Sequence, residues 1–531
     1  MTASHQLLIK NILQTPIVYN PDQEIVYKGE KRFTYAQFHA RIKRLANVLR
    51  TMGVKKGDTV AVMDYDSNRY LECYFAVPMI GAILHTINIR LSPEQMLYTI
   101  EHAEDDVILV HHDFLPLLDQ IKGRISGVHT YITLYEDDQC EYEKMLAAQS
   151  DDFIFEEFDE NTIATTFYTT GTTGMPKGVY FTHRQLVLHT LGGIAALSTP
   201  KEQGRFHRED VYMPMTPMFH VHAWGIPYIA TMMGLKQVYP GRYVPDQLIE
   251  LLDKEKVTFS HCVPTILHML LSSPKIDEVD LSRWKVIIGG SALPKALCVA
   301  ALERGMDVYT GYGMSETCPL LSLAQLDSLQ LALDIDAQAD IRIKTGRPIG
   351  MVEMKLVDES MQEVSSDGES TGEIVVRAPW LTQGYLKDKK NSEHLWIGGY
   401  LHTGDIATRD AQGYFKVTDR AKDIIKVSGE WVSSLELEDI IGQHTEVSEV
   451  AVIGSPHEKW GEIPLALVVP KEESSVTPKE IALFAKDYIK KGIMVRESML
   501  LKVRFVESIE KTSVGKVNKK YLREHYASSE A

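Results

Sequence analysis

The sequence has few cysteines and no long apolar run. Its five cysteines are scattered, odd in number and never spaced as CxxC, which favours a reducing compartment and indicates neither a disulfide framework nor a zinc site. The most apolar stretch, "YFAVPMIGAIL", is far too short to span a bilayer. The N-terminus lacks a basic segment followed by an apolar run, so no signal peptide is predicted. We expect a cytoplasmic protein with no integral membrane segment.

Positive charge is outnumbered by negative charge. The formal net charge of −16 argues against nucleic-acid binding, which needs a cationic surface. An anionic small substrate is still possible, because a few well-placed lysines can reverse the local field. No nucleophile elbow or catalytic triad is recognisable, so no motif indicates a covalent mechanism at a serine or a cysteine.

What the sequence does contain is an alternation of strands and helices. A chain of 531 residues predicts roughly three or four structural units. As far as about residue 345, strand-like stretches alternate with helical ones, which is typical of parallel sheets covered on both faces. Residues 345–420 resemble a small β unit, and a short α/β segment follows. We therefore predict an α/β fold with a large N-terminal domain (1–421) and a small, mobile C-terminal α+β domain (422–531).

The stretch "YTTGTTGMPKG" at 168–178 combines glycines, threonines and one lysine. It follows a predicted strand and precedes another, so we interpret it as a loop whose amides and hydroxyls hold phosphate oxygens. It is not a Walker A loop, because Pro176 and Gly178 stand where that motif needs a glycine and a hydroxyl residue. A surface loop without a ligand remains the alternative. The candidate phosphate ligands are Thr169, Thr170, Gly171, Thr172, Thr173, Gly174 and Lys177.

Three further segments carry chemistry. In "TGYGMSET" (310–317), Tyr312 could stack on a planar base, and Glu316 could hold a magnesium ion, which prefers carboxylate and phosphate oxygens. In "YLHTGD", Asp405 follows a predicted tight turn and could accept bonds from ribose hydroxyls. The basic segment "KTSVGK" offers Lys516. Each alone has an ordinary alternative, such as a core tyrosine or a turn aspartate.

Taken in order, these segments resemble the adenylate-forming superfamily. The resemblance rests on "YTTGTTGMPKG", "PMFH", "GYGMSET", "LHTGD", "DRAKDIIKVSGEW" and "KTSVGK", which span nearly the whole chain. The text around "PMFHVHAWG" and "KVSGEWVSSLELE" is most similar to the fatty acyl-CoA synthetase branch, including medium-chain and methylmercaptopropionate-type relatives.

The resemblance implies residue roles. Lys516, Glu316 and Lys177 would be catalytic, Lys422 would be the hinge, and Thr169 and Glu316 would bind the metal. His220, Trp224 and Gly313 would form the acyl site. Besides the phosphate loop, the implied ATP and AMP contacts are Gly290, Ser291, Thr310, Gly311, Tyr312, Ser315, Asp405, Arg420, Lys422, Lys426, Trp431 and Lys516.

The resemblance also implies two half-reactions. A carboxylate and ATP would give an acyl-adenylate and pyrophosphate, and coenzyme A would then displace AMP, with Mg²⁺ at the phosphates. We expect a short-to-medium or medium-chain aliphatic acid as substrate and a homodimer. The alternatives are an enzyme that adenylates amino acids or aryl acids, and a nucleotide-binding pseudoenzyme. "MFHVHAW" contains no acidic residue to pair with a substrate amine.

The same stretch contains an HxH pair, His220 and His222. On a strand, both rings would face one side, which is compatible with metal binding. No nearby cysteine or carboxylate cluster completes the four ligands of a zinc site, so we favour an acyl-site wall. For Trp224, a gate over the acyl tunnel and a plain core tryptophan both stay open.

Overall fold

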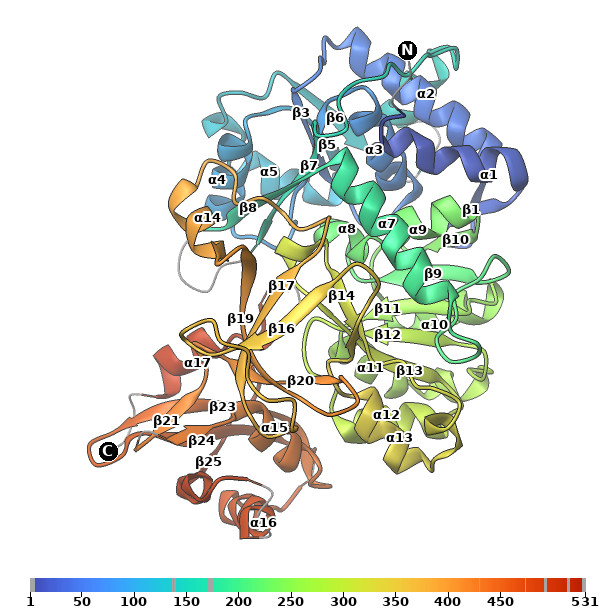
Figure 1. Ribbon diagram of the computed structural model, residues 1–531. Coiled ribbons are helices and arrows are strands. Elements are labelled where there is room, and N and C mark those ends of the chain that lie inside the picture. Colours follow the sequence, from blue (N-terminus) through green and yellow to red (C-terminus); the bar gives the residue numbers. More distant parts are fainter. Residues whose placement is uncertain are drawn as a thin grey trace.

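A computed structural model describes residues 5–135, 137, 140–169, 175–428, 430–472, 474–490, 494–512 and 516–527. Two large sheets form the N-terminal part of the chain (Figure 1). In the first, the strand order is β6-β5-β3-β4-β7-β8, and only β8 runs antiparallel to its neighbour. Its strands are β3 (Thr59–Met63), β4 (Ile83–Thr86), β5 (Asp105–His111), β6 (Thr130–Leu134), β7 (Ile163–Thr169) and β8 (Lys177–Thr182).

The second sheet has the order β15-β14-β13-β12-β11-β9-β10-β1-β2. Its six central strands are parallel, and β2, β14 and β15 are antiparallel additions at the edges. The strands are β1 (Glu24–Tyr27), β2 (Lys31–Thr34), β9 (Val211–Met215), β10 (Lys236–Tyr239), β11 (Phe259–Cys262), β12 (Lys285–Ile288), β13 (Asp307–Gly313), β14 (Leu320–Leu323) and β15 (Arg347–Pro348).

Two smaller sheets follow along the chain, and they lie together at one end of the molecule (Figure 1). The third sheet contains β16 (Glu353–Val357), β17 (Gly372–Arg377), β18 (Trp396–Ile397), β19 (Tyr400–Arg409) and β20 (Phe415–Arg420). The fourth contains β21 (Ile425–Val427), β22 (Glu430–Val432), β23 (Val447–His457), β24 (Gly461–Pro470) and β25 (Lys502–Phe505). The predicted architecture is therefore confirmed: parallel α/β sheets, a small β unit and a C-terminal α+β part.

Helices cover these sheets, and local signals set where several of them begin. Thr34 with Gln37 and Thr182 with Gln185 form capping boxes, in which side chains bond the first free backbone N–H groups. The helices are α1 (Gln14–Tyr19), α2 (Tyr35–Thr51), α3 (Asn68–Met79), α4 (Pro93–Ala103), α5 (Leu115–Asp119), α6 (Glu141–Ala147), α7 (His183–Ser198), α8 (Val221–Trp224), α9 (Ile226–Met233), α10 (Pro245–Lys254), α11 (Pro264–Leu271), α12 (Lys295–Glu303), α13 (Ile335–Arg342), α14 (Lys389–Leu395), α15 (Ser434–Gly442), α16 (Pro478–Lys490) and α17 (Lys519–Tyr526).

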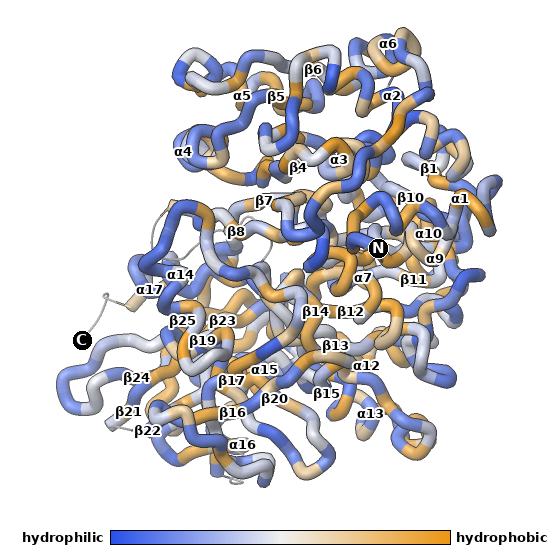
Figure 2. The backbone as a smooth tube through the Cα atoms, turned by 45° about the horizontal axis from the view of Figure 1, so that its top comes forward, coloured by the Kyte–Doolittle hydropathy of each residue, from blue (hydrophilic) through white to orange (hydrophobic). Residues whose placement is uncertain are grey.

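Apolar strands form the cores between these layers (Figure 2). Every residue of α3 is buried. None of the helices in the described ranges is long and apolar enough to cross a membrane.

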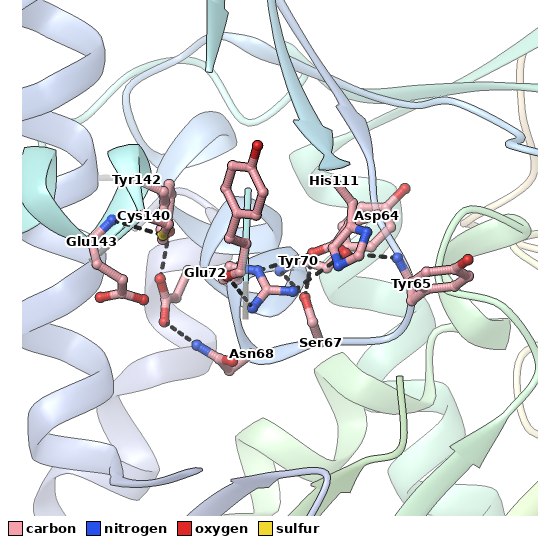
Figure 3. A network of polar contacts seen from close by, with 12 residues as sticks. Asp64, Tyr65, Ser67, Asn68, Tyr70, Glu72, His111, Cys140, Tyr142 and Glu143 are labelled. Atoms are coloured by element: carbon pink, nitrogen blue, oxygen red, sulfur yellow. Dashed lines mark hydrogen bonds and ion pairs between the residues drawn. The ribbon is translucent and has the colours of Figure 1, made fainter. Parts of the chain in front are cut away.

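A buried charge network joins α2, α3 and α6 beside the first sheet. Glu72 is fully buried and accepts hydrogen bonds from Arg41 Nε at 2.7 Å, from Asn68 at 3.0 Å and from the Tyr142 hydroxyl. Arg41 also pairs with Glu143 at 2.8 Å. In Figure 3, Glu72 lies between Asn68 and Tyr142. Because its carboxylate is buried, it depends on these partners for its stability.

Replacing Glu72 with glutamine should therefore destabilise the fold by about 3 kcal/mol, since the Arg41 guanidinium would lose a buried counter-charge. The midpoint of urea unfolding measures this. Glu94→Gln is the matched control, because Glu94 pairs with Arg124 at 2.6 Å on the exposed surface, where ion pairs contribute little. Equal shifts of the urea midpoint in the two variants would show that the buried network contributes no more stability than an exposed ion pair.

Candidate active site

The hairpin of β7 and β8 positions the first candidate residues. Thr169 ends β7 and lies directly opposite Lys177, the first residue of β8. The Thr169 hydroxyl donates to the Lys177 carbonyl at 3.5 Å. The predicted phosphate contacts at Thr170, Gly171, Thr172, Thr173 and Gly174 lie outside the described residues and stay predictions.

Tyr385 connects this hairpin to Glu316. The Lys177 ammonium lies 4.7 Å from the centre of the Tyr385 ring. The Tyr385 hydroxyl in turn donates to Glu316 Oε1 at 2.7 Å. Glu316 is buried, so its carboxylate is held in place beside the lysine. Tyr385 thus joins Glu316, which lies much further along the chain, to the hairpin that carries Thr169 and Lys177.

A second cluster forms around Asp405. Its carboxylate accepts a hydrogen bond from the Tyr312 hydroxyl at 2.7 Å and pairs with Arg420 Nε at 3.1 Å. Asp405 and Arg420 are direct cross-strand partners in β19 and β20. Burial and the nearby Asp405 raise the pKa of Tyr312 well above its usual range, so its hydroxyl stays a donor.

The expected tight turn before Asp405 is wrong. Asp405 lies in the middle of β19. The preceding Gly404 has φ +69°, a left-handed conformation that favours glycine. The strand continues through this local distortion, which explains why "TG" resembles a turn in the sequence.

The carboxyl ends of β12 and β13 form a close-packed backbone surface. Gly290 has φ +79°, and a Cβ atom on Gly313 would lie 1.8 Å from the Pro319 carbonyl oxygen. The Thr310 hydroxyl is buried and has no hydrogen-bond partner among the described residues. A crevice at the carboxyl ends of parallel strands is where open α/β sheets bind ligands, and an unused buried hydroxyl suits a polar ligand.

Lys516 reaches this surface from the C-terminal part. A Cβ atom on Gly290 would lie 3.5 Å from Lys516 Cε. Burial and the nearby Arg420 lower the pKa of Lys516 to about 8, and the charges of Asp405 and Glu316 oppose this shift. Lys516 therefore interacts electrostatically with a carboxylate of each cluster, Asp405 and Glu316.

A cavity of about 50 Å³ adjoins Lys516. Most of its wall comes from the carboxyl ends of the two large sheets. It is lined by Arg90, Met215, Thr216, Pro217, His220, Trp224, Tyr243, Val263, Thr265, Ile266, Gly290 and Lys516. The predicted acyl-site residues His220 and Trp224 are in this wall, whereas Gly313 is not. Burial, aided by Lys516, lowers the pKa of His220 to about 3, so its ring is neutral at neutral pH.

His220 and His222 do not lie on a strand. Val221, His222, Ala223, Trp224 and Gly225 have φ values of +41°, +58°, +47°, +58° and +72°. These five residues, here called the left-handed turn, include four that carry side chains, each at a cost of roughly 1–2 kcal/mol. Such a conformation persists only where surrounding contacts enforce it.

The turn separates the two histidines. The His222 ring is fully buried, with ring centres of Tyr74 and Phe167 at 5.8 and 5.3 Å. Burial lowers the pKa of His222 to about 3. His220 instead lines the cavity. The two rings therefore do not face one side as they would on a strand, because the backbone is left-handed here.

Other predicted residues occupy varied positions. Gly311 and Ser315 lie beside Tyr312 and Glu316 in the chain, and Ser291 is exposed next to Gly290. Lys422 lies in the turn between β20 and β21. Burial lowers its pKa, and the charge of Arg420 lowers it further. Lys426 and Trp431 are cross-strand partners in the β21–β22 hairpin, and both are exposed. Their nucleotide contacts stay predictions.

Sequence reasoning missed Tyr385, Arg90 and Tyr243. Tyr385 contacts Glu316 across 69 residues, and no local pattern indicates such a contact. Arg90 and Tyr243 follow β4 and β10. Their positions just beyond strands could have indicated a role in ligand binding, since ligands bind at the carboxyl ends of strands in open α/β sheets.

Comparison with known proteins agrees with this geometry. Residues 14–386 match the AMP-binding enzyme family, and residues 436–516 match the AMP-binding enzyme C-terminal domain. The chain is 40% identical to a long-chain-fatty-acid–CoA ligase of Thermus thermophilus, over 94% of this chain and 92% of that protein. It is 35% identical to a 3-methylmercaptopropionyl-CoA ligase of Ruegeria pomeroyi, covering 98% and 97% of the two chains.

Solved structures show the same fold. An anthranilate CoA ligase in complex with anthranoyl-AMP superposes with a TM-score of 0.86 at 23% identity, over 97% of this chain and 96% of that one. The chain therefore belongs to the AMP-binding enzyme family, and it is an AMP-forming acid–CoA ligase of the fatty acyl-CoA synthetase branch.

Proposed function

We propose that the acid is a short-to-medium or medium-chain aliphatic one and that it binds in the cavity beside Lys516. The observation that supports this proposal is the lining of this cavity. Met215, Trp224, Val263 and Ile266 contribute apolar walls, and Lys516 lines the same cavity. The lysine suits a carboxylate, and the apolar side chains suit the alkyl chain of an aliphatic acid.

The residue roles follow from the charges. A carboxylate oxygen of the acid attacks the α-phosphorus of ATP, and the bond to the pyrophosphate oxygen breaks. Two anions must approach each other, so positive groups that face the developing charge lower the barrier. Lys516 faces the carboxylate and the α-phosphate, and Lys177 faces the β- and γ-phosphates. Asp405 accepts the ribose hydroxyls, and the coenzyme A thiolate later displaces AMP from the acyl carbon.

Magnesium fits the residues at the phosphate end. Thr169 and Glu316 offer a hydroxyl and a carboxylate oxygen, the ligand types that Mg²⁺ prefers, and both lie near Lys177. When bound, the ion supplies charge neutralisation at the phosphates. The protein's own contribution is to hold Glu316 through Tyr385.

An amino-acid substrate is the competing proposal. It needs a buried carboxylate facing the substrate amine. Asp66 accepts a hydrogen bond from the Met218 backbone N–H, but it does not line the cavity in the described part of the chain. The geometry therefore favours an acid without an amine.

A panel of acids tests the substrate class. AMP formation should be measured with ATP and coenzyme A across straight-chain acids from acetate to palmitate. We expect the highest kcat/KM between butyrate and decanoate. Strict specificity for acetate, a preference for palmitate or a requirement for an amino acid would contradict the proposal.

The pH dependence of adenylation should report Lys516. Its charged form is the competent one, and its pKa is lowered to about 8. The kcat/KM for pyrophosphate release should be flat below pH 8 and fall as pH rises through about 8. Bound phosphates favour the charged form, so the fall in kcat should occur at higher pH. Lys516→Arg should remove the fall, because arginine stays charged; an unchanged profile would assign it to another group.

Four further proposals concern the whole chain. We propose a boundary between domains at residues 421–422, in the connection between the third and fourth sheets. We also propose rotation of the C-terminal domain between the half-reactions. A homodimer and a cytoplasmic location complete the proposal, and light scattering of the purified protein tests the dimer.

A further inference from the structure

We infer that Asp66 is a positioning residue for the acyl site: it holds the left-handed turn and the cavity wall in one arrangement. This inference rests on the proposed function, which assigns the cavity to the acid. Asp66 does not line the cavity itself. It acts through Met218, at the base of the turn, and through Tyr243, in the wall.

The Asp66 carboxylate joins these two residues directly. Its Oδ1 accepts a hydrogen bond from the Met218 backbone N–H at 2.8 Å, and its Oδ2 accepts one from the Tyr243 hydroxyl at 2.6 Å. Asp66 is only 3% exposed, so water does not compete for these bonds. A single side chain therefore sets the distance between the base of the turn and Tyr243.

The backbone of Asp66 is itself held between the two large sheets. Asp66 follows β3 of the first sheet, and its carbonyl accepts from the Gly241 N–H at 2.9 Å, just after β10 of the second. Met218 follows β9. Asp66 thus ties together the carboxyl ends of three strands, where the acid is proposed to bind.

The left-handed turn needs such support because its backbone conformation is unfavourable for side-chain-bearing residues. Other bonds hold the same segment: the Thr86 hydroxyl donates to the Phe219 carbonyl at 3.0 Å, and the Tyr74 hydroxyl donates to the Met218 carbonyl. Asp66 contributes the carboxyl group of this set, and burial raises the pKa of that carboxyl to about 7. Without it, the Met218 N–H loses its acceptor, and His220 and Trp224 lose their fixed places.

A neighbouring carboxylate offers a matched control. Asp64 is in the same loop, is equally buried, and accepts a hydrogen bond from the Ser67 hydroxyl at 2.6 Å (Figure 3). It also accepts one from Arg69 Nε at 3.3 Å. These bonds support α3 rather than the turn. Asp64→Asn should therefore lower stability without changing the acid site.

The test is a comparison of steady-state constants for Asp66→Ala, Asp66→Asn, Tyr243→Phe and Asp64→Asn, with butyrate and octanoate as acids. In Asp66→Ala the KM for the acid should rise by about 10²-fold, the scale of a misplaced binding group. The KM for ATP should stay within about twofold. Asp66→Asn keeps an acceptor for the Met218 N–H and should recover most of the loss. Tyr243→Phe removes only one of the two bonds to Asp66 and should raise the acid KM less than Asp66→Ala, with a smaller fall in the thermal midpoint.

Two results would overturn the inference. One is a fall in kcat with unchanged acid KM in the Asp66 and Tyr243 variants. The other is an equal rise in acid KM in Asp64→Asn, which would mean that any damage to this loop has the same effect. Wild-type enzyme that activates neither acid would contradict the proposed function instead, so the two failures are distinguishable.

Discussion

Lys516→Ala should slow acyl-adenylate formation by about 10²–10³-fold or more, which is the effect of losing one preorganised group at a developing charge. Lys516 lies against Gly290 and forms part of the cavity wall. Its ammonium can therefore face both the acid and the α-phosphate. Thioester formation from supplied acyl-adenylate should change much less, because that step needs the lysine withdrawn. Single-turnover assays of each half-reaction measure the two rates separately.

Lys511→Ala is the matched control for this prediction. Lys511 belongs to the same basic segment but pairs with Glu449 at 2.9 Å. Its loss should leave adenylation unchanged. If Lys516→Ala slowed both half-reactions equally, the lysine would be structural or its assigned role wrong.

Lys422→Pro should keep much of the pyrophosphate-forming activity and lose most thioester formation. Lys422 lies between β20 and β21, which belong to different sheets. A rotation of the C-terminal part needs a change of φ and ψ at such a connection. Proline holds φ near −65° and restricts the residue before it. Lys516 is at the cavity in the present arrangement, so adenylation does not require the rotation.

The contacts around this connection show what a rotation would change. The Ser434 N–H donates to Asp419 at 2.7 Å across the connection, and the Ser433 hydroxyl donates to the Thr418 carbonyl at 2.5 Å. Lys422→Ala removes the side chain but leaves the backbone free, so it should retain the thioester formation that the proline variant loses. Full thioester turnover in Lys422→Pro would exclude a hinge at this residue.

Features set by local sequence were predictable. The capping box at Thr182 sets the start of α7 through two residues that are three positions apart, and the apolar run within α3 is visible in the sequence. Parallel strands alternate with helices as their composition indicates, because burial on both faces demands near-continuous apolar residues. Glu316, Asp405 and Lys516 were found because each lies in a short motif, "GYGMSET", "LHTGD" and "KTSVGK" respectively.

Features set by distant contacts were not predictable from one sequence. The left-handed turn depends on Asp66 and Tyr74, which are about 150 residues away. The strand at Asp405 continues through Gly404 because β17 and β20 pair on either side of it. Tyr385 joins Glu316 to Lys177 across the fold. A linear pattern carries no signal for such contacts.

Transfer of an oxygen isotope tests the central claim most directly. The acid should be labelled with ¹⁸O in its carboxylate and incubated with ATP and coenzyme A, and the AMP released should be analysed by mass spectrometry. An acyl-adenylate retains one carboxylate oxygen on phosphorus when the thiolate displaces AMP. We expect one labelled oxygen in each AMP and none in pyrophosphate. Unlabelled AMP, or formation of ADP with label in phosphate, would contradict adenylate formation at this site.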